Sequence, residues 1–283
     1  MPGTPSVKDV AVVQFPSIGM TEVRNITATP AAGLNGDWIT KERLRNLLNV
    51  RMPREGEVSS SIYLRPGETS GSDMWNERIS RLNGLPEGNG CGLVGLRAGV
   101  RTLIIAPPFP VLESGLYPTW NDEPLGRLLE AERTIGVVLV RLGRYSVAVY
   151  RGSDLESSKT DSRYVKGKHH AGGTSQLRYT RIREGQMRRL YVKVCESIRS
   201  QFEPVSSELD HVILGGEKFT LNGFLKVCPR LNDYRDILLN RRLNIRDPKR
   251  DTLFDLGSTI YESRVWGLAV SYTHLTLPTI YSV

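Results

Sequence analysis

The sequence predicts an α/β fold in which helices flank a mixed β-sheet, preceded by a smaller α+β region. Ile135–Arg141 and Tyr145–Tyr150, joined by Leu142-Gly143-Arg144, have the spacing of a β-hairpin. The first of these runs is apolar on both faces, which is typical of a central strand in a covered sheet. An amphipathic run over Ser175–Phe202 predicts the main covering helix, and His211–Leu214 predicts a further buried strand.

The part of the chain before this hairpin predicts shorter elements. Residues 1–34 are rich in Pro, Gly, Thr and Ala, which predicts a flexible leader. Thr40 is placed to cap a helix over Lys41–Asn49, because its hydroxyl oxygen can accept from an N–H of the first turn. Glu68–Gly90 is polar and predicts a long loop without an assigned conformation. The other expected elements are a strand at Ser59–Leu64, a strand at Leu103–Ala106, and a helix from Pro124 to about Arg133 capped by Asp122.

The long helix carries a predicted core stripe, because its apolar side chains recur at intervals of three and four residues. The stripe consists of Tyr179, Ile182, Leu190, Val194, Ile198 and Phe202. The side chains of Arg178, Arg181, Arg188 and Arg189 fall largely off the stripe and can face a ligand. Pro204 ends the helix, and a further helix is expected at Thr220–Val227.

These elements predict four segments along the chain. Residues 1–34 form the leader, residues 35–123 the N-terminal α+β region, and residues 124–269 the main α/β domain. Residues 270–283 resemble the conceptual translation of a sequencing adaptor, so we expect them not to be native. His274 in this segment therefore carries no functional weight.

The composition excludes several classes of protein. Of the 283 residues 39% are hydrophobic and 24% charged, which excludes global disorder. No apolar run approaches the roughly 18 residues of a membrane span, and no signal peptide is predicted. Cys91, Cys195 and Cys228 are odd in number and widely spaced, which predicts neither a disulfide framework nor a zinc site. We therefore expect a cytoplasmic protein that has no membrane partner and binds no metal.

The excess positive charge is concentrated in one segment. Between Ser162 and Lys193 there are nine cations and one anion, Glu184, so this segment alone accounts for the net charge of +8 of the whole chain. A charged run is most often a solvated helix face. Here, however, the cations are interspersed with Tyr164, Tyr179 and Tyr191. Cations beside aromatic rings suit RNA, because phosphates pair with the charges and bases stack on the rings.

The same segment contains the residue pattern that indicates chemistry. Gly172 and Gly173 let the backbone approach a ligand closely, and Thr174 or Ser175 can cap the helix that follows. N–H groups at a helix start favour an anion or oxyanion, and the amide of Gln176 can donate to one oxygen while it accepts from a water. These features suit attack on an ester or phosphodiester without a metal or nucleotide cofactor. On spacing alone, a plain Gly-Gly turn with a helix cap remains the alternative.

A longer stretch around these residues resembles a known family. Lys166-Gly167-Lys168-His169-His170-Ala171-Gly172-Gly173, with the spaced residues up to Arg183-Glu184, is similar to the catalytic loop and helix of eukaryotic and archaeal class 1 peptide-chain release factors. It is more similar still to their bacterial relatives in the Vms/Ankzf family of peptidyl-tRNA hydrolases. In that family Gly-Gly is followed by a variable residue and Ser-Gln, as in residues 172–176. The resemblance covers about residues 124–266, and more weakly the part from Trp38 onward.

This resemblance implies a release-factor central-domain fold and a function on the ribosome. It implies that the basic helix and loop enter the peptidyl-transferase region and meet the CCA end of a stalled peptidyl-tRNA. Gly172 and Gly173 would allow entry, and Gln176 would orient a water or the terminal ribose hydroxyl. The release factors place their glutamine at the position of Thr174, whereas the Vms/Ankzf register places it at Gln176. The implied RNA contacts are Lys166, Lys168, His169, His170, Arg178, Arg181 and Arg183.

Three other interpretations stay open on the sequence. Some eukaryotic members of the family cut the tRNA near its CCA end instead of hydrolysing the ester. A non-catalytic module that binds the ribosome or RNA would retain the basic helix without the chemistry. A structural domain with a basic surface loop would show no salt-sensitive RNA affinity.

Overall fold

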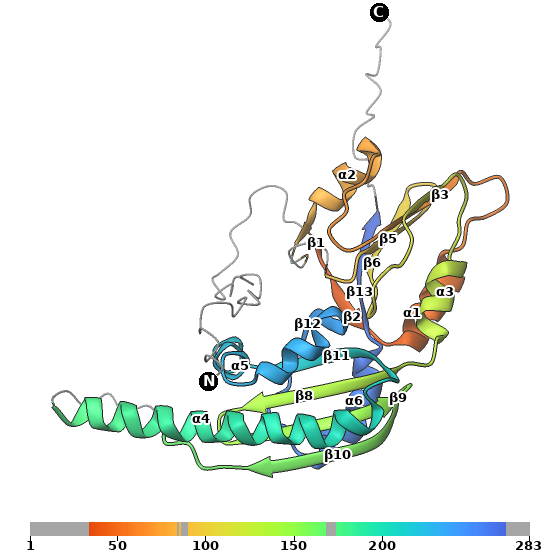
Figure 1. Cartoon of the computed structure of the whole chain (residues 1–283). Helices are drawn as coiled ribbons and strands as arrows, with labels where there is room; N and C mark the ends of the chain where they lie inside the picture. Colours follow the sequence, from red (N-terminus) through yellow and green to blue (C-terminus); the bar gives the residue numbers. More distant parts are fainter. Residues whose placement is uncertain (1–33, 84, 86–89, 168–173, 270–283) are drawn as a thin grey trace, which may run out of the picture. The chain divides into compact units, whose positions relative to one another are not determined.

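A computed structural model describes residues 34–83, 85, 90–167 and 174–269. These residues divide into two compact units (Figure 1). One unit contains residues 127–262, and the other contains residues 34–126 together with residues 263–269. Each unit is built around a β-sheet of its own.

The unit of residues 127–262 contains a five-stranded mixed sheet in the order β10-β9-β8-β11-β12. The hairpin strands β8 (Thr134–Arg141) and β9 (Arg144–Arg151) are antiparallel, and so are β9 and β10 (Asp154–Ser162). In contrast, β11 (Leu209–Gly216) runs parallel to β8 and to β12 (Leu238–Leu243). Strand β8 is central and its first seven residues are buried, which confirms the position expected for it.

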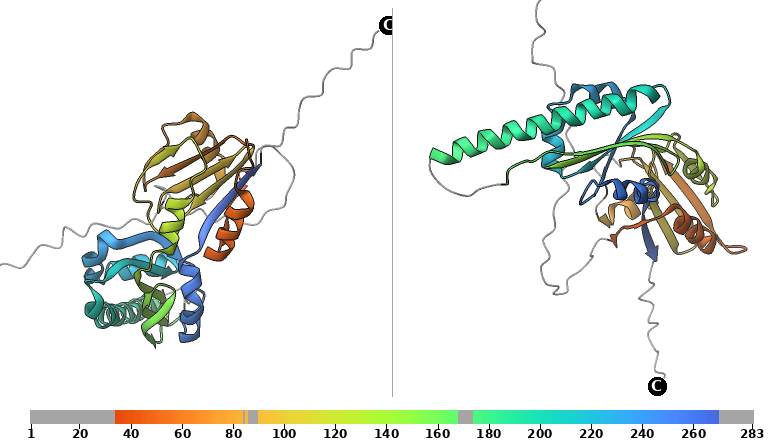
Figure 2. Two further views of the ribbon diagram at one scale, coloured as in Figure 1. Left: turned by 90° about the vertical axis from the view of Figure 1, so that its right-hand side faces the viewer. Right: turned by 90° about the horizontal axis from the view of Figure 1, so that it is seen from below.

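Helices cover both faces of this sheet. Successive side chains of β9 point to opposite sides, so they contact different helices. Tyr145, Val147 and Val149 face the core formed with α4 (Thr174–Phe202) and α5 (Lys218–Leu225). On the other face, the Tyr150 hydroxyl donates to the Leu253 carbonyl oxygen of α6 (Arg250–Ile260) at 2.6 Å. Figure 2 shows α4 and α6 on opposite sides of these strands. Two 3₁₀ segments, Glu203–Val205 and Pro229–Ile237, complete the unit.

The second unit contains a six-stranded sheet in the order β2-β13-β6-β5-β3-β7, in which every pairing is antiparallel. A short parallel pair, β1 (Leu34–Asn35) with β4 (Leu82–Asn83), lies outside this sheet. Trp75 and Trp266 are fully buried in a core with Ile62, Leu93 and Ile104. The strands are β2 (Asp37–Ile39), β3 (Ser59–Leu64), β5 (Leu93–Ala98), β6 (Arg101–Ala106), β7 (Gly115–Tyr117) and β13 (Ser263–Ala269).

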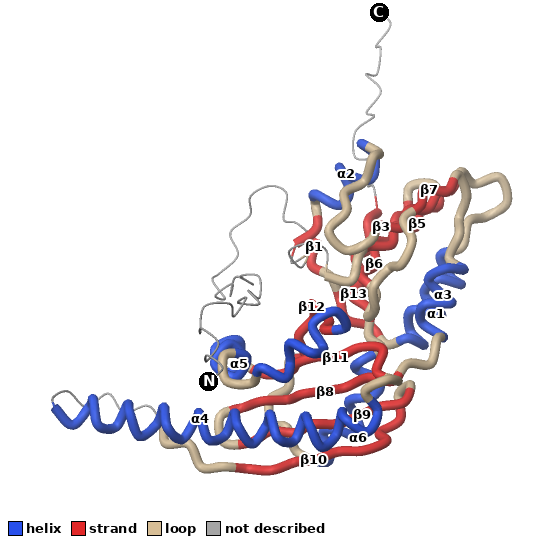
Figure 3. The backbone as a smooth tube through the Cα atoms, viewed as in Figure 1, coloured by secondary structure: helices blue, strands red, loops and turns tan. Residues whose placement is uncertain are grey.

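Three helices belong to the N-terminal part of the chain: α1 (Lys41–Arg51), α2 (Asp73–Ser80) and α3 (Glu123–Glu130). The Thr40 hydroxyl accepts from the Arg43 N–H at 3.4 Å, which confirms the predicted cap. Helix α2 lies in the segment for which the sequence predicts only a loop. Figure 3 shows how helices alternate with strands along the chain.

The structure confirms a mixed sheet flanked by helices, but it changes one predicted boundary. The sequence assigned residues 124–269 to one domain, whereas β13 pairs with β2 and β6 in the sheet of the other unit. The apolar character of β13 is compatible with a place in either sheet. Its backbone pairing with β2 and β6 shows that it belongs to the six-stranded sheet. The main domain therefore ends near Glu262. Residues 1–33 and 270–283 lie outside the described residues, so the leader and adaptor assignments stay predictions.

None of the helices within the described ranges is long and apolar enough to cross a membrane.

Candidate nucleic-acid interface

Helix α4 is packed along its C-terminal half and projects from the sheet along its N-terminal half (Figures 1 and 2). Leu190, Val194, Ile198 and Phe202 are fully buried against the strands. The ring of Phe202 fills space that the missing side chain of Gly136 leaves on β8, because a Cβ there would lie 2.6 Å from Phe202 Cζ. The sheet thus holds one half of the helix, and the other half extends beyond it.

The predicted core stripe is too long at its N-terminal end. Tyr179 and Ile182 are each 40% exposed, and Leu177 is 66% exposed. The periodicity of the helix continues into this end, but α4 here extends beyond the strands of the described sheet. The projecting part of α4 therefore presents apolar and aromatic side chains to solvent beside its cations.

Gln176 lies in the first turn of α4 and is exposed. Its backbone carbonyl oxygen accepts from the Thr180 hydroxyl at 3.0 Å. Among the residues that the structure describes, none forms a hydrogen bond with its side-chain amide. The first turn contains no acidic residue, so no carboxylate of that turn neutralises the positive end of the helix dipole.

Four exposed arginines form a surface that we call the basic face. Helical residues advance by about 100° each, so Arg178, Arg181, Arg188 and Arg189 fall within an arc of about 100°. No ion pair of the described residues involves any of them. Lys193, by contrast, pairs with Glu196 at 2.6 Å. The basic face is therefore available for a polyanion.

The tyrosines that accompany these cations in the sequence do not all reach the surface. Tyr164 is 77% exposed, and Tyr179 is partly exposed. Tyr191 is only 4% exposed, and its ring packs against Phe224 of α5 with the centroids 6.0 Å apart. The expectation of an aromatic surface thus applies to two of the three rings, and Tyr191 belongs to the core.

Two of the expected RNA contacts, Lys166 and Arg183, also bind each other. Arg183 Nε donates to the Lys166 carbonyl oxygen at 2.9 Å, and Gln186 Oε1 accepts from the Lys166 N–H at 2.9 Å. The Lys166 ammonium lies 4.2 Å from the centroid of the Tyr179 ring. These contacts attach the segment after β10 to α4. The sequence pattern does not single out Gln186, since nothing around it differs from an ordinary helical glutamine.

The remaining predicted site residues cannot be placed in the same detail. Lys168, His169, His170, Gly172 and Gly173 lie outside the described residues, and so does any contact that they make. Thr174 and Ser175 begin α4, which agrees with a helix start directly after the diglycine. Their roles as catalytic, RNA-binding and capping residues stay predictions.

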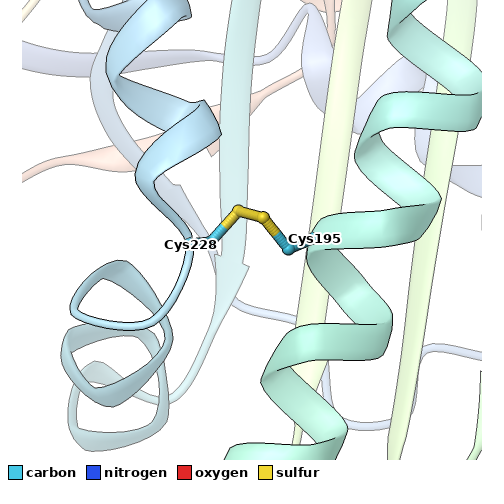
Figure 4. Close-up of a disulfide and its surroundings, with 2 residues drawn as sticks. All are labelled: Cys195 and Cys228. Atoms are coloured by element: carbon cyan, nitrogen blue, oxygen red, sulfur yellow. A yellow bond between two sulfur atoms is a disulfide. The ribbon is translucent and has the colours of Figure 1, made fainter. Parts of the chain in front are cut away.

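A disulfide joins Cys195 of α4 to Cys228, just beyond α5 (Figure 4). The two Cα atoms are 5.5 Å apart, although 33 positions separate the residues in sequence. The expectation that the cysteines form no disulfide is therefore wrong for this pair, while the buried thiol of Cys91 takes no part in a disulfide and donates to the Pro108 carbonyl oxygen at 3.5 Å. Spacing cannot reveal such a pair, because only the packing of the helices brings the two thiols together.

The chemistry open to this surface is that of positioning and electrostatics. Gln176 offers both a donor and an acceptor, and the first-turn N–H groups can stabilise developing negative charge. Within the described part of the chain, no three or more His, Cys, Asp or Glu side chains are grouped to hold a metal ion. Such an arrangement suits the binding of a polyanion and the ordering of a nucleophile at an ester or phosphodiester.

Sequence comparison shows that this domain is similar to release factors. Residues 133–265 match the family described as Actinobacteria/chloroflexi VLRF1 release factor. Peptide chain release factor subunit 1 from Methanopyrus kandleri is 30% identical over 196 residues, covering 65% of this chain and 47% of that protein. The same factor from Thermococcus sibiricus is 32% identical over 132 residues, covering 45% of this chain and 32% of that protein. The chain thus spans about half the length or less of these relatives.

Solved structures give weaker similarities. An archaeal translation termination factor, aRF1, is 17% identical with a TM-score of 0.37, covering 81% of this chain and 73% of that one. The Vms1 mitochondrial localization core is 12% identical with a TM-score of 0.36, covering 69% of this chain and 84% of that one. The assignment rests on the sequence matches. Residues 133–265 are thus similar to the VLRF1 release-factor family and to archaeal release factor subunit 1.

Proposed function

We propose that this protein is a ribosome-associated peptidyl-tRNA hydrolase of the Vms/Ankzf type, which releases nascent chains from stalled ribosomes. The observation that carries the proposal is the position of Gln176. Its side chain is exposed at the projecting end of a basic helix, and its amide is not engaged by any described residue. A glutamine buried in the core or held by internal hydrogen bonds would be unable to reach the acceptor end of a tRNA.

The projecting part of α4 supplies two surfaces with separate roles. The basic face would bind RNA phosphates, and from Arg178 to Arg189 it extends about 17 Å along the helix axis. Around the helix axis, Gln176 lies largely opposite that face, on the same side as Arg183. The basic face would therefore determine affinity. Gln176 would act on the ester, with Gly172 and Gly173 allowing its close approach.

No metal or other cofactor enters this proposal. Gln176 would order a water or the terminal ribose hydroxyl, and the first-turn N–H groups would stabilise the oxyanion that forms at the ester carbonyl. Lys166, Lys168, His169, His170, Arg178, Arg181 and Arg183 would contact the tRNA and the ribosome near the peptidyl-transferase centre.

Release from a purified stalled ribosome complex tests the proposal. We expect Gln176→Ala to abolish peptide release, with ribosome binding in a sedimentation assay unchanged within about twofold. Release by this variant at the rate of the wild-type protein would contradict a catalytic role and favour a module that only binds. Arg199→Ala is the matched control, because Arg199 lies near the far end of α4 and pairs with Glu203 at 3.1 Å.

Gel analysis of the tRNA product identifies the bond that is cut. Intact deacylated tRNA is expected for ester hydrolysis. A tRNA shortened at its 3′ end would instead assign the protein to the CCA-end nucleases of the same family.

The salt dependence of binding tests the basic face. Log affinity falls as log salt concentration rises. The double variant Arg178→Ala/Arg181→Ala should make this negative slope shallower by about 1.5 to 2, if each guanidinium neutralises one phosphate. An unchanged slope would place the RNA on another surface.

A further inference from the structure

The segment that leads from β10 toward the diglycine is attached to the domain by successive contacts. The Arg163 N–H donates to the Gly143 carbonyl oxygen of the hairpin turn at 2.8 Å. Val165 packs against the core formed by the sheet and α4. Lys166 is then held by α4, whereas Gly167 is exposed and a Cβ added there would meet no atom within 4 Å. Lys166 is thus the last residue of this segment that the described structure holds.

The way in which Lys166 is held is specific. Lys166 lies outside any strand, yet both its N–H and its carbonyl oxygen have partners. The partners are Gln186 Oε1 and Arg183 Nε, three residues apart on α4. Residues with this spacing lie on the same side of a helix, so together they replace the neighbouring strand that would otherwise pair with Lys166. The ring of Tyr179 under the Lys166 ammonium adds a third contact from the same side of α4.

This attachment lies on the side of α4 that Gln176 also occupies. At about 100° per residue, Gln176, Tyr179, Arg183 and Gln186 fall within an arc of about 80°, largely opposite the basic face. Eight residue steps connect Lys166 to Thr174, with a reach of about 26–29 Å when fully extended. The axial distance from Thr174 to Arg183 and Gln186 is about 14–18 Å, which is about half to two-thirds of that reach. If Lys166 were displaced, the length of chain available to extend Gly172 and Gly173 beyond the start of α4 would change.

We propose that Gln186 and Arg183 are positioning residues, which clamp Lys166 to α4 and so hold the entry to the diglycine segment on the side of Gln176. This inference rests on the proposed hydrolase function for its consequence, but not for the clamp itself. Gln186 Oε1 and Arg183 Nε bind the backbone of Lys166, so these atoms do not contact the substrate. Their effect on the reaction would be to fix where the chain begins its approach to the acceptor end of the tRNA.

Amide hydrogen exchange in the intact 283-residue chain tests the clamp without any substrate. The Lys166 amide should exchange at least tenfold faster in Gln186→Leu, which has no acceptor, than in the wild-type protein. Gln186→Glu keeps an acceptor oxygen and should retain the protection. Glu196→Gln on the same helix is the control and should leave the exchange of Lys166 unchanged. Equal exchange in the wild-type and Gln186→Leu proteins would overturn the clamp.

Peptide release then tests the positioning role. We expect Gln186→Leu to lower the maximal release rate at least tenfold, with the concentration for half-maximal release changed less than twofold, and Gln186→Glu to restore the rate. Faster Lys166 exchange with unchanged release would overturn the positioning role. If even the wild-type protein releases no peptide, the proposed function fails. The exchange measurement then still decides by itself whether the clamp exists.

Discussion

The hydroxyls of Tyr145 on β9 and Ser197 on α4 are hydrogen-bonded at 2.9 Å in a fully buried interface. Burial raises the pKa of the Tyr145 phenol, so the group stays neutral and able to share its proton with Ser197. This is a polar contact inside an otherwise apolar surface, and it fixes the position of the helix along the strand.

Tyr145→Phe should lower the free energy of unfolding by about 1–3 kcal/mol, because it leaves the Ser197 hydroxyl buried without this partner. Urea unfolding at pH 7 measures the change. Tyr164→Phe is the matched control, since Tyr164 is 77% exposed and its loss of a hydroxyl should cost less than about 0.5 kcal/mol. Equal effects of the two variants would contradict the role of the buried contact.

Gly136→Ala should lower the free energy of unfolding by about 1–3 kcal/mol through overpacking. The added Cβ would lie 2.6 Å from Phe202 Cζ, so β8 and the end of α4 would have to separate. Gly185→Ala gives the opposite expectation. A Cβ added at Gly185, inside α4, would have open space around it to 4 Å, so alanine should stabilise the helix by about 0.5–1 kcal/mol. Thermal unfolding of both variants compares the two signs, and a destabilised Gly185→Ala would contradict the packing described here.

Reduction of the Cys195–Cys228 disulfide should lower the free energy of unfolding by about 3–4 kcal/mol, because the bond closes a loop of 33 residues in the unfolded chain. Urea unfolding with and without a thiol reductant measures this, and peptide mapping without reduction identifies the linked pair. The double variant Cys195→Ala/Cys228→Ala should not respond to the reductant. If the wild-type protein is equally insensitive and all its thiols can be alkylated, the bond does not form in solution.

His211 should make the folded state weaker in acid. Burial, followed by the nearby Arg133, lowers the pKa of His211 to about 4, against 6.5 for an unperturbed histidine. Between these two pKa values His211 is protonated in the unfolded chain but neutral in the folded protein. The free energy of unfolding therefore falls as the pH decreases from 6.5 toward 4. The loss is at most about 2–3 kcal/mol by pH 4.5.

The variant His211→Gln separates this contribution from that of the carboxylates. Its free energy of unfolding should change less between pH 7.5 and pH 4.5 than that of the wild-type protein, as measured by urea unfolding at the two pH values. Identical pH dependence in both proteins would show that the folded state does not lower the pKa of His211.

Local sequence patterns were sufficient for the hairpin and for the extent of the long helix. The alternation and apolar character of residues 135–150 depend on neighbouring side chains alone, and α4 begins within one residue of its expected start. Strand β10 was not predicted, because it is an edge strand with mostly exposed polar side chains and has little hydrophobic signal.

The candidate site was predictable in its residue types but not in its contacts. The glutamine, the cations and the helix start follow from the motif around residues 172–183. Tyr191 is buried and Tyr179 is partly exposed, because the sheet covers only part of α4. Helical periodicity alone does not show where that cover ends. The clamp on Lys166 and the pairing of Cys195 with Cys228 join residues 20 and 33 positions apart, so they appear only when the fold is known.

The place of β13 between β2 and β6 has a consequence for how the chain folds as it is synthesised. Residues 34–117 supply the other five strands of that six-stranded sheet, but β13, one of its interior strands, is translated last. All of residues 127–262 have left the peptidyl-transferase centre by then and can already form their own core. Of the two units, the one whose strands are translated earlier is therefore expected to be completed later, with its sheet open between β2 and β6 until residue 269 has emerged.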